Sequence, residues 1–386
     1  MKKAFIKKAF EERFRKKPIM VRSPGRVNLI GEHTDYNEGF VLPAAIDKNM
    51  YFAMATNSSE NINLHASDLD ETYSVSLNTI SKIDLQWANY ILGTVAQIQG
   101  KGNKLGGFDC VFGSDIPIGA GLSSSAALEC GTAIGLNELF GLGLNRLELA
   151  EICRKAEHDY AGVKCGIMDQ FAVLFGKKEK ALKLDCRSLE HEYLPFGMSD
   201  YKLVLCDTGI KHNLADSAYN DRRQTCQQGV SFFQTFLPEI ASLRDVTIEM
   251  LQQHKNLFDP FVYKKCMFVV KENIRVDKAC ETLAKNNLRE FGSLMYRSHQ
   301  GLQKEYNVSC KELDFLVEQT RKDENVLGAR MMGGGFGGCS INLVRASYIP
   351  GFIDKMVILY EKNMHRELKC HFVSITDGVA IETEWE

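Results

Sequence analysis

The chain has 386 residues, of which 45% are hydrophobic, which is enough material for a packed core and for two domains. Its 47 lysine and arginine residues nearly balance its 49 aspartate and glutamate residues, so the net charge of -2 gives no bulk attraction toward nucleic acid or acidic lipid. The 12 cysteines include no Cys-x-x-Cys pair and are typical of free thiols in a reducing compartment, so we expect a cytoplasmic protein that binds no zinc, no nucleic acid and no membrane.

The first predicted element is a surface helix at residues 2–14, in which Phe5, Phe10 and Phe14 share a face that packs on the domain. This segment lacks the apolar core of a secretory signal, and its two glutamates are atypical of an organelle presequence. We therefore interpret it as part of the fold.

A dense polar motif follows a predicted strand at residues 19–22. Residues 23–36 are Ser-Pro-Gly-Arg-Val-Asn-Leu-Ile-Gly-Glu-His-Thr-Asp-Tyr, and an apolar turn follows at residues 39–43. A core strand would fill this span with apolar residues, and a solvated loop would not need so many charged and imidazole groups in succession. The motif predicts a binding site with four candidate side chains, which are Arg26, Glu32, His33 and Asp35.

A loop rich in glycine and serine, residues 113–125, follows a predicted strand and precedes a helix that begins at Ser124. Gly119 and Gly121 let the backbone approach an anion, and the amides and dipole at a helix N-terminus favour negative charge. The loop therefore predicts a phosphate cradle, with an N-capped helix after a flexible turn as the structural alternative. The candidate nucleotide-binding residues are Gly119, Ala120, Gly121, Leu122, Ser123, Ser124 and Ser125.

Two acidic residues follow the loop. Asp169 is flanked by Ile167, Met168 and Phe171, which predicts that it is at least half buried. A buried carboxylate usually has a partner, so a structural ion pair or a helix cap is the alternative to a catalytic role. Glu157 lies late in a helix predicted at residues 146–160, and taken alone it is typical of a solvated helix charge.

The second half of the chain is mostly helical, with three short β-like segments near its end at residues 329–332, 339–344 and 371–375. Residues 333–338 contain a formal G-x-G-x-x-G pattern between two of these segments. Because a strand follows instead of the helix of a dinucleotide fold, we interpret the pattern as a glycine hairpin that contacts a ligand or the first lobe. These elements predict an α+β protein of two lobes, residues 1–198 and 199–386.

Three motifs occur in the order typical of one known superfamily, at residues 24–36, 117–127 and 333–338. With them, the sequence resembles the galactokinases of the galacto-, homoserine, mevalonate and phosphomevalonate (GHMP) kinase superfamily. The first motif, Gly-Glu-His-Thr-Asp-Tyr-Asn followed by Gly-Phe-Val-Leu-Pro, is the one that points to galactose. The resemblance implies a lobe like the second domain of ribosomal protein S5, a ferredoxin-like C-terminal lobe, and an active site between them.

The resemblance also implies binding roles. Residues of the first motif hold the sugar hydroxyls together with two later positions, and the full set is Glu32, His33, Asp35, Gly166 and Tyr219. The loop at residues 119–125 would surround the phosphates of ATP, with Ser125 and Glu157 nearest to Mg²⁺. Trp87 aligns with a family residue near adenine, although a core tryptophan at a helix start is an equal alternative.

The implied reaction is the ATP-dependent phosphorylation of D-galactose at its anomeric hydroxyl, which yields galactose 1-phosphate and ADP in the Leloir pathway. Asp169 would accept the proton of that hydroxyl as it attacks the γ-phosphorus, and Arg26 would stabilise the carboxylate and the developing charge. Because an aspartate is a weak base and phosphoryl transfer is loose, positioning and charge neutralisation would carry more of the rate than the proton transfer.

Two alternatives remain at this point. An N-acetylgalactosamine kinase would usually differ at Thr34 and at residues 37–40, which here keep the galactokinase pattern. A transcriptional sensor that binds galactose and ATP without turnover would lack the Ser-Ala step, which is intact at Ser125 and Ala126. We expect a monomer whose ligands are galactose and ATP.

Overall fold

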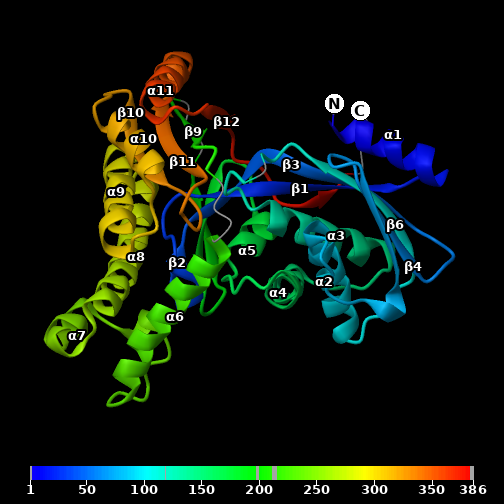
Figure 1. Ribbon diagram of the computed structural model, residues 1–386, viewed down its shortest axis with the longest axis horizontal. Helices are drawn as coiled ribbons and strands as arrows, with labels where there is room; N and C mark the ends of the chain where they lie inside the picture. Colours follow the sequence, from blue (N-terminus) through cyan, green and yellow to red (C-terminus); the bar gives the residue numbers. More distant parts are fainter. Residues whose placement is uncertain (1, 118, 197–199, 211–214, 383–386) are drawn as a thin grey trace.

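The structure, a computed structural model, describes residues 2–117, 119–196, 200–210 and 215–382. Helices and strands are mixed in the α+β manner that the sequence predicts. Figure 1 shows two bodies side by side, one formed mainly by the first half of the chain and one by the second. The expected boundary between residues 198 and 199 lies outside the described residues.

The N-terminal sheet has, among the described residues, six strands in the order β13-β1-β3-β6-β4-β5, all antiparallel neighbours except the parallel pair β4 and β6. These strands are β1 (Ile19–Asn28), β3 (Pro43–Thr56), β4 (Asn61–Ala66), β5 (Glu71–Ser76), β6 (Phe108–Ser114) and β13 (Ala380–Ile381). Helix α1 (Lys2–Phe14) packs against β3 and β6 on one face, and α3 (Ser124–Leu139) packs against β1 and β3 on the other (Figure 1). The helices α2 (Gln86–Gly100), α4 (Arg146–Ala156) and α5 (Met168–Phe175) pack around α3.

The C-terminal sheet is antiparallel, with the order β10-β11-β9-β12 in the described part of the chain. Its strands are β9 (Tyr201–Asp207), β10 (Val326–Met331), β11 (Cys339–Arg345) and β12 (Lys369–Val373). The helices of this half are α6 (Ala215–Gln234), α7 (Ile248–Gln253), α8 (Pro260–Ala284), α9 (Leu288–Gly301), α10 (Lys311–Arg321) and α11 (Ile349–Met364). Helix α8 starts where Asp259 accepts two backbone hydrogen bonds and Pro260 takes the first helical position, which needs no amide donor.

Two further features join the halves. A small sheet of β2 (Phe40–Val41), β7 (Lys180–Asp185) and β8 (His191–Pro195) belongs to the N-terminal half, and its strands β2 and β8 pack against α8 of the C-terminal half. Strand β13 returns to the N-terminal sheet, where it pairs with Val21 and Arg22 of β1. The end of the C-terminal half therefore completes the sheet of the N-terminal half.

Helix α1 differs from the prediction in which face it buries. Ile6 and Phe10 are fully buried and Phe14 is partly buried, but Phe5 is 55% exposed. Because a helix advances about 100° per residue, positions four apart share a face, whereas Phe5 lies about 140° from Phe10.

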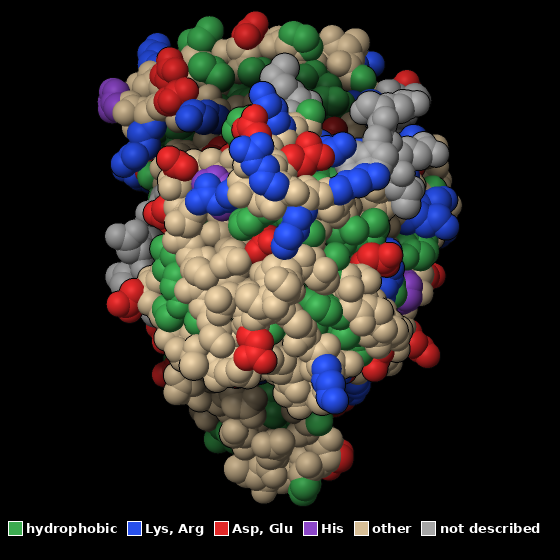
Figure 2. All heavy atoms as spheres, turned by 90° about the vertical axis from the view of Figure 1, so that its right-hand side faces the viewer, with side chains coloured by type: hydrophobic (Ala, Val, Ile, Leu, Met, Phe, Trp, Pro, Cys, Tyr) green, Lys and Arg blue, Asp and Glu red, His purple; other side chains and the backbone are tan. Residues whose placement is uncertain are grey.

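Figure 2 shows Lys, Arg, Asp and Glu side chains interspersed on the face at the right of Figure 1. No helix in the described part of the chain is long and apolar enough to cross a bilayer.

Two elements near the motifs also differ from expectation. Strand β1 extends beyond residues 19–22 to Asn28, with a register shift against β3 between Pro24 and Arg26, so Arg26 lies on the strand itself. Such an irregularity accommodates a proline, which lacks a ladder donor. The helix expected at residues 146–160 is α-helical only to Ala156 and continues as a π-helical turn, Glu157–Ala161.

Candidate active site

A cavity of about 440 Å³ lies between the two halves of the chain. Its walls come from the polar motif after β1, the serine loop before α3, the start of α5 and the glycine hairpin between β10 and β11. The predicted site residues that line it are Arg26, Glu32, His33, Asp35, Gly119, Gly121, Leu122, Ser123, Ser124, Ser125, Glu157, Asp169 and Tyr219. All three motifs therefore meet at one site.

Arg26 on β1 and Asp169 on α5 form a bidentate ion pair in the cavity wall. Arg26 Nε and Nη2 donate to the two Asp169 oxygens at 2.7 and 2.8 Å, and Nη1 donates to the Gly121 carbonyl at 2.6 Å. Burial lowers the pKa of Arg26, but the Asp169 carboxylate, together with the charges of Glu32 and Asp35, outweighs burial and leaves this pKa raised. The pair therefore presents a fixed cation and a carboxylate to the same cavity.

Ser123 holds the second oxygen of this carboxylate. It precedes α3 in a left-handed conformation, with φ of 54°, and its hydroxyl donates to Asp169 Oδ2 at 2.5 Å. Its side chain makes no capping hydrogen bond to α3 among the described residues. The alternative of a simple serine N-cap is therefore wrong for Ser123, which orients Asp169 instead.

Glu32 connects the polar motif to the glycine hairpin. Its side chain is 2% exposed, and its Oε1 accepts a hydrogen bond from the Gly333 amide at 2.8 Å. Arg330 on β10 pairs with the same oxygen at 3.1 Å and donates to the Asn28 carbonyl at 2.8 Å. The Glu32 carboxylate thus has a buried counter-ion and a fixed orientation.

Asp35 begins a short 3-10 turn, Asp35–Asn37, and lies against Gly166. A Cβ atom at Gly166 would be 2.2 Å from Asp35 Oδ2, so only glycine allows this close approach. Burial, and then the charge of Asp169, raise the pKa of Asp35 to about 7. Gly166 therefore packs against the Asp35 carboxylate, and it is not among the residues that line the cavity.

His33 is buried, with φ of 65°. Its Nε2 lies 3.2 Å from the Gly334 carbonyl and its Nδ1 lies 2.8 Å from the Tyr36 hydroxyl. The Tyr219 ring, on α6, lies 5.4 Å from the imidazole ring. Burial lowers the pKa of His33 to about 3, so the ring is neutral at physiological pH.

The serine loop and the glycine hairpin approach each other through their backbones. A Cβ atom at Gly121 would lie 3.5 Å from the Met332 carbonyl, and one at Gly338 would lie 3.6 Å from Ala120. Both glycines have positive φ, 74° and 75°, which other residues adopt at a cost. Ala120 is therefore buried under the hairpin, and the backbone at the start of α3 lies open to the cavity beside it.

Glu157, at the start of the π-helical turn, is buried, contrary to the expectation of a solvated charge. Gln170 Nε2 donates to Glu157 Oε2 at 2.7 Å and to Glu129 Oε2 at 3.1 Å. Burial, and then the charge of Asp169, raise the pKa of Glu157 to about 7, while hydrogen bonds to the carboxylate from Cys165, Ser125 and Gln170 oppose this shift. A carboxylate and a hydroxyl thus lie together at the base of the serine loop.

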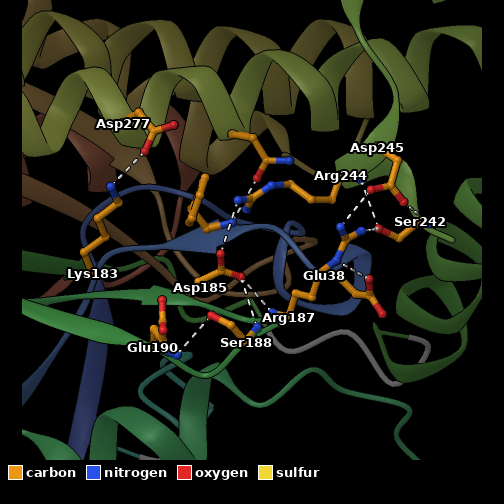
Figure 3. A network of polar contacts seen from close by, with 12 residues as sticks. Glu38, Lys183, Asp185, Arg187, Ser188, Glu190, Ser242, Arg244, Asp245 and Asp277 are labelled. Carbon is orange, nitrogen blue, oxygen red and sulfur yellow. Dashed lines mark hydrogen bonds and ion pairs between the residues drawn. The ribbon is translucent and has the colours of Figure 1, made fainter. Parts of the chain in front are cut away.

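A set of ion pairs connects Glu38, which follows the polar motif, to the β7–β8 turn and to the segment around Asp245 (Figure 3). Arg187, in the turn between β7 and β8, pairs with Glu38 at 2.8 Å and with Asp245 at 2.7 Å. Arg244 pairs with Asp185 at 3.2 Å. These contacts hold the segment that follows the Asp35–Asn37 turn.

Sequence reasoning missed some residues of the site, and one residue that it assigned does not line the cavity. Arg330 carries no motif signal, because a lone arginine on a strand is normally a surface residue. Trp87 is not among the residues lining the cavity; its Nε1 donates to Glu71 Oε2 at 2.6 Å, whereas Tyr90, one turn further along α2, lines the cavity. Adenine contact at Trp87 thus stays a prediction that the cavity does not support.

Comparison with known families agrees with this geometry. Residues 89–177 match the GHMP kinase N-terminal domain and residues 279–356 match the GHMP kinase C-terminal domain. The fold and the cleft thus define a GHMP kinase, an ATP-dependent enzyme of the two-lobed kind that the sequence predicts. Residues 8–56 match the galactokinase galactose-binding signature, which covers the polar motif.

Individual relatives specify the family further. The chain is 40% identical to a galactokinase of Thermotoga maritima over 94% of its own length and 99% of the relative, and 39% identical to one of Clostridium acetobutylicum over 92% of each. A Lactococcus lactis galactokinase complexed with galactose matches with a TM-score of 0.95 at 35% identity, covering 98% of this chain and 99% of that one. The chain belongs to the galactokinase family. Methanococcus jannaschii mevalonate kinase, with a TM-score of 0.66 at 19% identity over 94% of this chain and 100% of that one, shares the fold.

Proposed function

We propose that this sugar kinase transfers the γ-phosphoryl group of ATP to the anomeric hydroxyl of D-galactose at the cavity between its two halves. The observation that carries the proposal is the Arg26–Asp169 pair, which lies where the galactose-binding signature, the serine loop and the glycine hairpin meet. A carboxylate and a cation fixed at one point suit a reaction in which a hydroxyl loses its proton and attacks a phosphoryl group.

Asp169 accepts the hydroxyl proton in this proposal. Its oxygens are oriented by Arg26 and Ser123, so the carboxylate needs no reorganisation when the hydroxyl approaches. Arg26 neutralises the charge that develops as the bond to phosphorus forms. The backbone at the start of α3 supplies amide donors to the phosphates of ATP.

The sugar pocket would be formed by Glu32, His33, Asp35 and Tyr219, all of which line the cavity. A galactose molecule carries several hydroxyls, each both donor and acceptor, and a fixed set of carboxylates, imidazole and phenol can distinguish their positions. Gly166 contributes by letting Asp35 approach closely.

The residues at the base of the serine loop fit Mg²⁺, although no cluster of three or more metal-binding side chains occurs in the part of the chain that the structure describes. Mg²⁺ keeps waters and phosphate oxygens and commonly takes only one or two protein oxygens. The Ser125 hydroxyl and the Glu157 carboxylate supply these, and burial has already raised the pKa of Glu157, so a cation there would favour its ionised form. When bound with ATP, Mg²⁺ would neutralise phosphate charge.

The test is an ADP-release assay with Mg-ATP in which D-galactose, N-acetylgalactosamine, glucose and mevalonate are compared as acceptors, and the product is located by phosphorus NMR. Turnover with galactose alone and a sugar 1-phosphate signal are the expected results. Turnover with N-acetylgalactosamine would indicate the neighbouring kinase, and binding of galactose and ATP without ADP release would indicate a sensor. The monomeric state and cytoplasmic location stay predictions.

A further inference from the structure

A continuous chain of hydrogen bonds leads from the glycine hairpin through His33 into the core of the C-terminal half. His33 Nε2 lies 3.2 Å from the Gly334 carbonyl, and His33 Nδ1 lies 2.8 Å from the Tyr36 hydroxyl. The Tyr36 hydroxyl lies 2.7 Å from the Tyr306 hydroxyl, which lies 3.2 Å from Cys226 Sγ. Neither Tyr306 nor Cys226 belongs to a motif that the sequence singles out.

The Gly334 carbonyl determines which group donates and which accepts in every hydrogen bond of this series. A carbonyl oxygen can only accept, so His33 Nε2 carries the hydrogen that bonds to Gly334. In a neutral imidazole Nδ1 is then the acceptor, so the Tyr36 hydroxyl donates to it. The Tyr36 oxygen therefore accepts from the Tyr306 hydroxyl, whose own oxygen accepts from the Cys226 thiol.

Packing and burial hold this arrangement in place. The Tyr306 ring lies 4.8 Å from the imidazole ring and its side chain is fully buried. Burial lowers the pKa of His33 to about 3, which keeps the ring in its neutral form. Arg222, on the same helix as Tyr219, donates to the backbone carbonyls of Tyr306 and Asn307 at 3.1 and 3.0 Å.

We propose that Tyr36 and Tyr306 are positioning residues that hold His33 as the neutral tautomer with its hydrogen on Nε2. His33 can then act toward the cavity only as a donor, either to Gly334 or to a sugar oxygen that takes the place of that carbonyl. The sugar hydroxyl that contacts His33 must accept a hydrogen bond from Nε2 and donate its own hydrogen to another group. The part of this inference that concerns the sugar rests on the proposed galactokinase function, whereas the tautomer does not.

The tautomer is tested by NMR on the full chain labelled with ¹⁵N-histidine, with the His33 signal among the nine histidines assigned by its loss in His33→Gln. We expect a single neutral imidazole with its hydrogen on Nε2 between about pH 5 and pH 8. Tyr36→Phe and Tyr306→Phe should both shift the Nδ1 resonance. A hydrogen on Nδ1, or a charged imidazole at neutral pH, would overturn the inference.

The functional part is tested by steady-state kinetics on the same variants. Tyr306→Phe should raise the KM for galactose about three- to tenfold, the value of one hydrogen bond, with little change in kcat or in the KM for ATP. The matched control is Tyr193→Phe, which removes a hydroxyl that donates to the Phe175 carbonyl at 2.7 Å and leaves the cavity residues intact. An unchanged galactose KM in Tyr306→Phe, or an equal rise in the control, would reject the positioning role; failure of the wild type to phosphorylate galactose would instead reject the proposed function.

Discussion

Replacing Asp169 with asparagine separates the chemistry of this carboxylate from its packing. The change keeps size and shape but removes the charge and one of the two Asp169 oxygens that accept hydrogen bonds from Arg26 Nε and Nη2. The amide also cannot take the proton of an attacking hydroxyl. We expect kcat to fall about 10²- to 10⁴-fold, the usual contribution of a positioned proton acceptor.

The same substitution should cost stability. A hydrogen bond to a charged group contributes about 1.5 to 3 kcal/mol, and Arg26, itself 4% exposed, would lose its closest counter-ion. Because the Asp169 side chain is 24% exposed, solvent offsets part of this loss. We therefore expect the free energy of unfolding to fall by roughly 1 to 3 kcal/mol, which leaves the chain folded.

The assay pairs turnover with binding. ADP release with Mg-ATP measures kcat, and calorimetry measures the Kd for galactose, which should change by no more than about threefold. The matched control is Ser123→Ala, which removes one contact to Asp169 but leaves both bonds to Arg26. A galactose Kd that weakens in step with kcat, or a kcat within tenfold of wild type, would refute the proton-acceptor role.

Three further predictions follow from other parts of the site. Folding raises the pKa of Asp35 from 3.8 to about 7, so the protonated carboxyl adds to the free energy of unfolding below about pH 4. This contribution is lost as the pH rises through 7. Asp35→Asn should flatten the fall in the free energy of unfolding over this pH range, which urea titration measures. Glu157→Gln should raise the Mg²⁺ concentration needed for ATP binding by at least about tenfold in calorimetry, with galactose binding unchanged. Arg187→Met removes exposed pairs to Glu38 and Asp245 worth up to about 1 kcal/mol each, so the galactose KM should rise about two- to fivefold, and less at high salt.

The Arg187 prediction has an internal control. Lys183 pairs with Asp277 at 2.9 Å in the network of Figure 3 and forms no ion pair with Glu38. Its nitrogen lies 5.0 Å from the centre of the Phe40 ring, and methionine can keep an apolar contact there, so Lys183→Met should leave the galactose KM unchanged. An equal effect of the two substitutions would mean that Arg187 acts through general stability. A wild-type pH profile in Asp35→Asn, or unaltered Mg²⁺ dependence in Glu157→Gln, would contradict the corresponding assignment.

The sequence predicted the parts of the fold and the site that depend on local pattern. The glycine hairpin was recognised because β-like segments flank it, and β10 and β11 confirm this. The meeting of the three motifs followed from the resemblance to the galactokinases, since composition and spacing cannot place segments far apart in the chain next to each other. The apolar neighbours of Asp169 predict that it is at least half buried, and its side chain is 24% exposed.

What the sequence could not predict depends on distant partners. Glu157 resembles a solvated helix charge until its burial beside Gln170 and Glu129 is known. Arg330 lies nearly three hundred positions from Glu32, and no periodicity links them. The π-helical turns, Glu157–Ala161 and Leu302–Tyr306, also carry no local signal, although each contributes a residue discussed above.

The return of β13 to the N-terminal sheet has a consequence for synthesis of the chain. Strand β1 carries Arg26 and has β3 on one side and β13 on the other, so while residues 380 and 381 are still in the ribosome one edge of β1 stays unpaired. An unpaired edge is a site for wrong pairing with other chains. Glu382, which pairs with Lys3 and Arg22, then holds this late strand against segments synthesised long before it. The N-terminal sheet is thus completed only after the C-terminal half has been made.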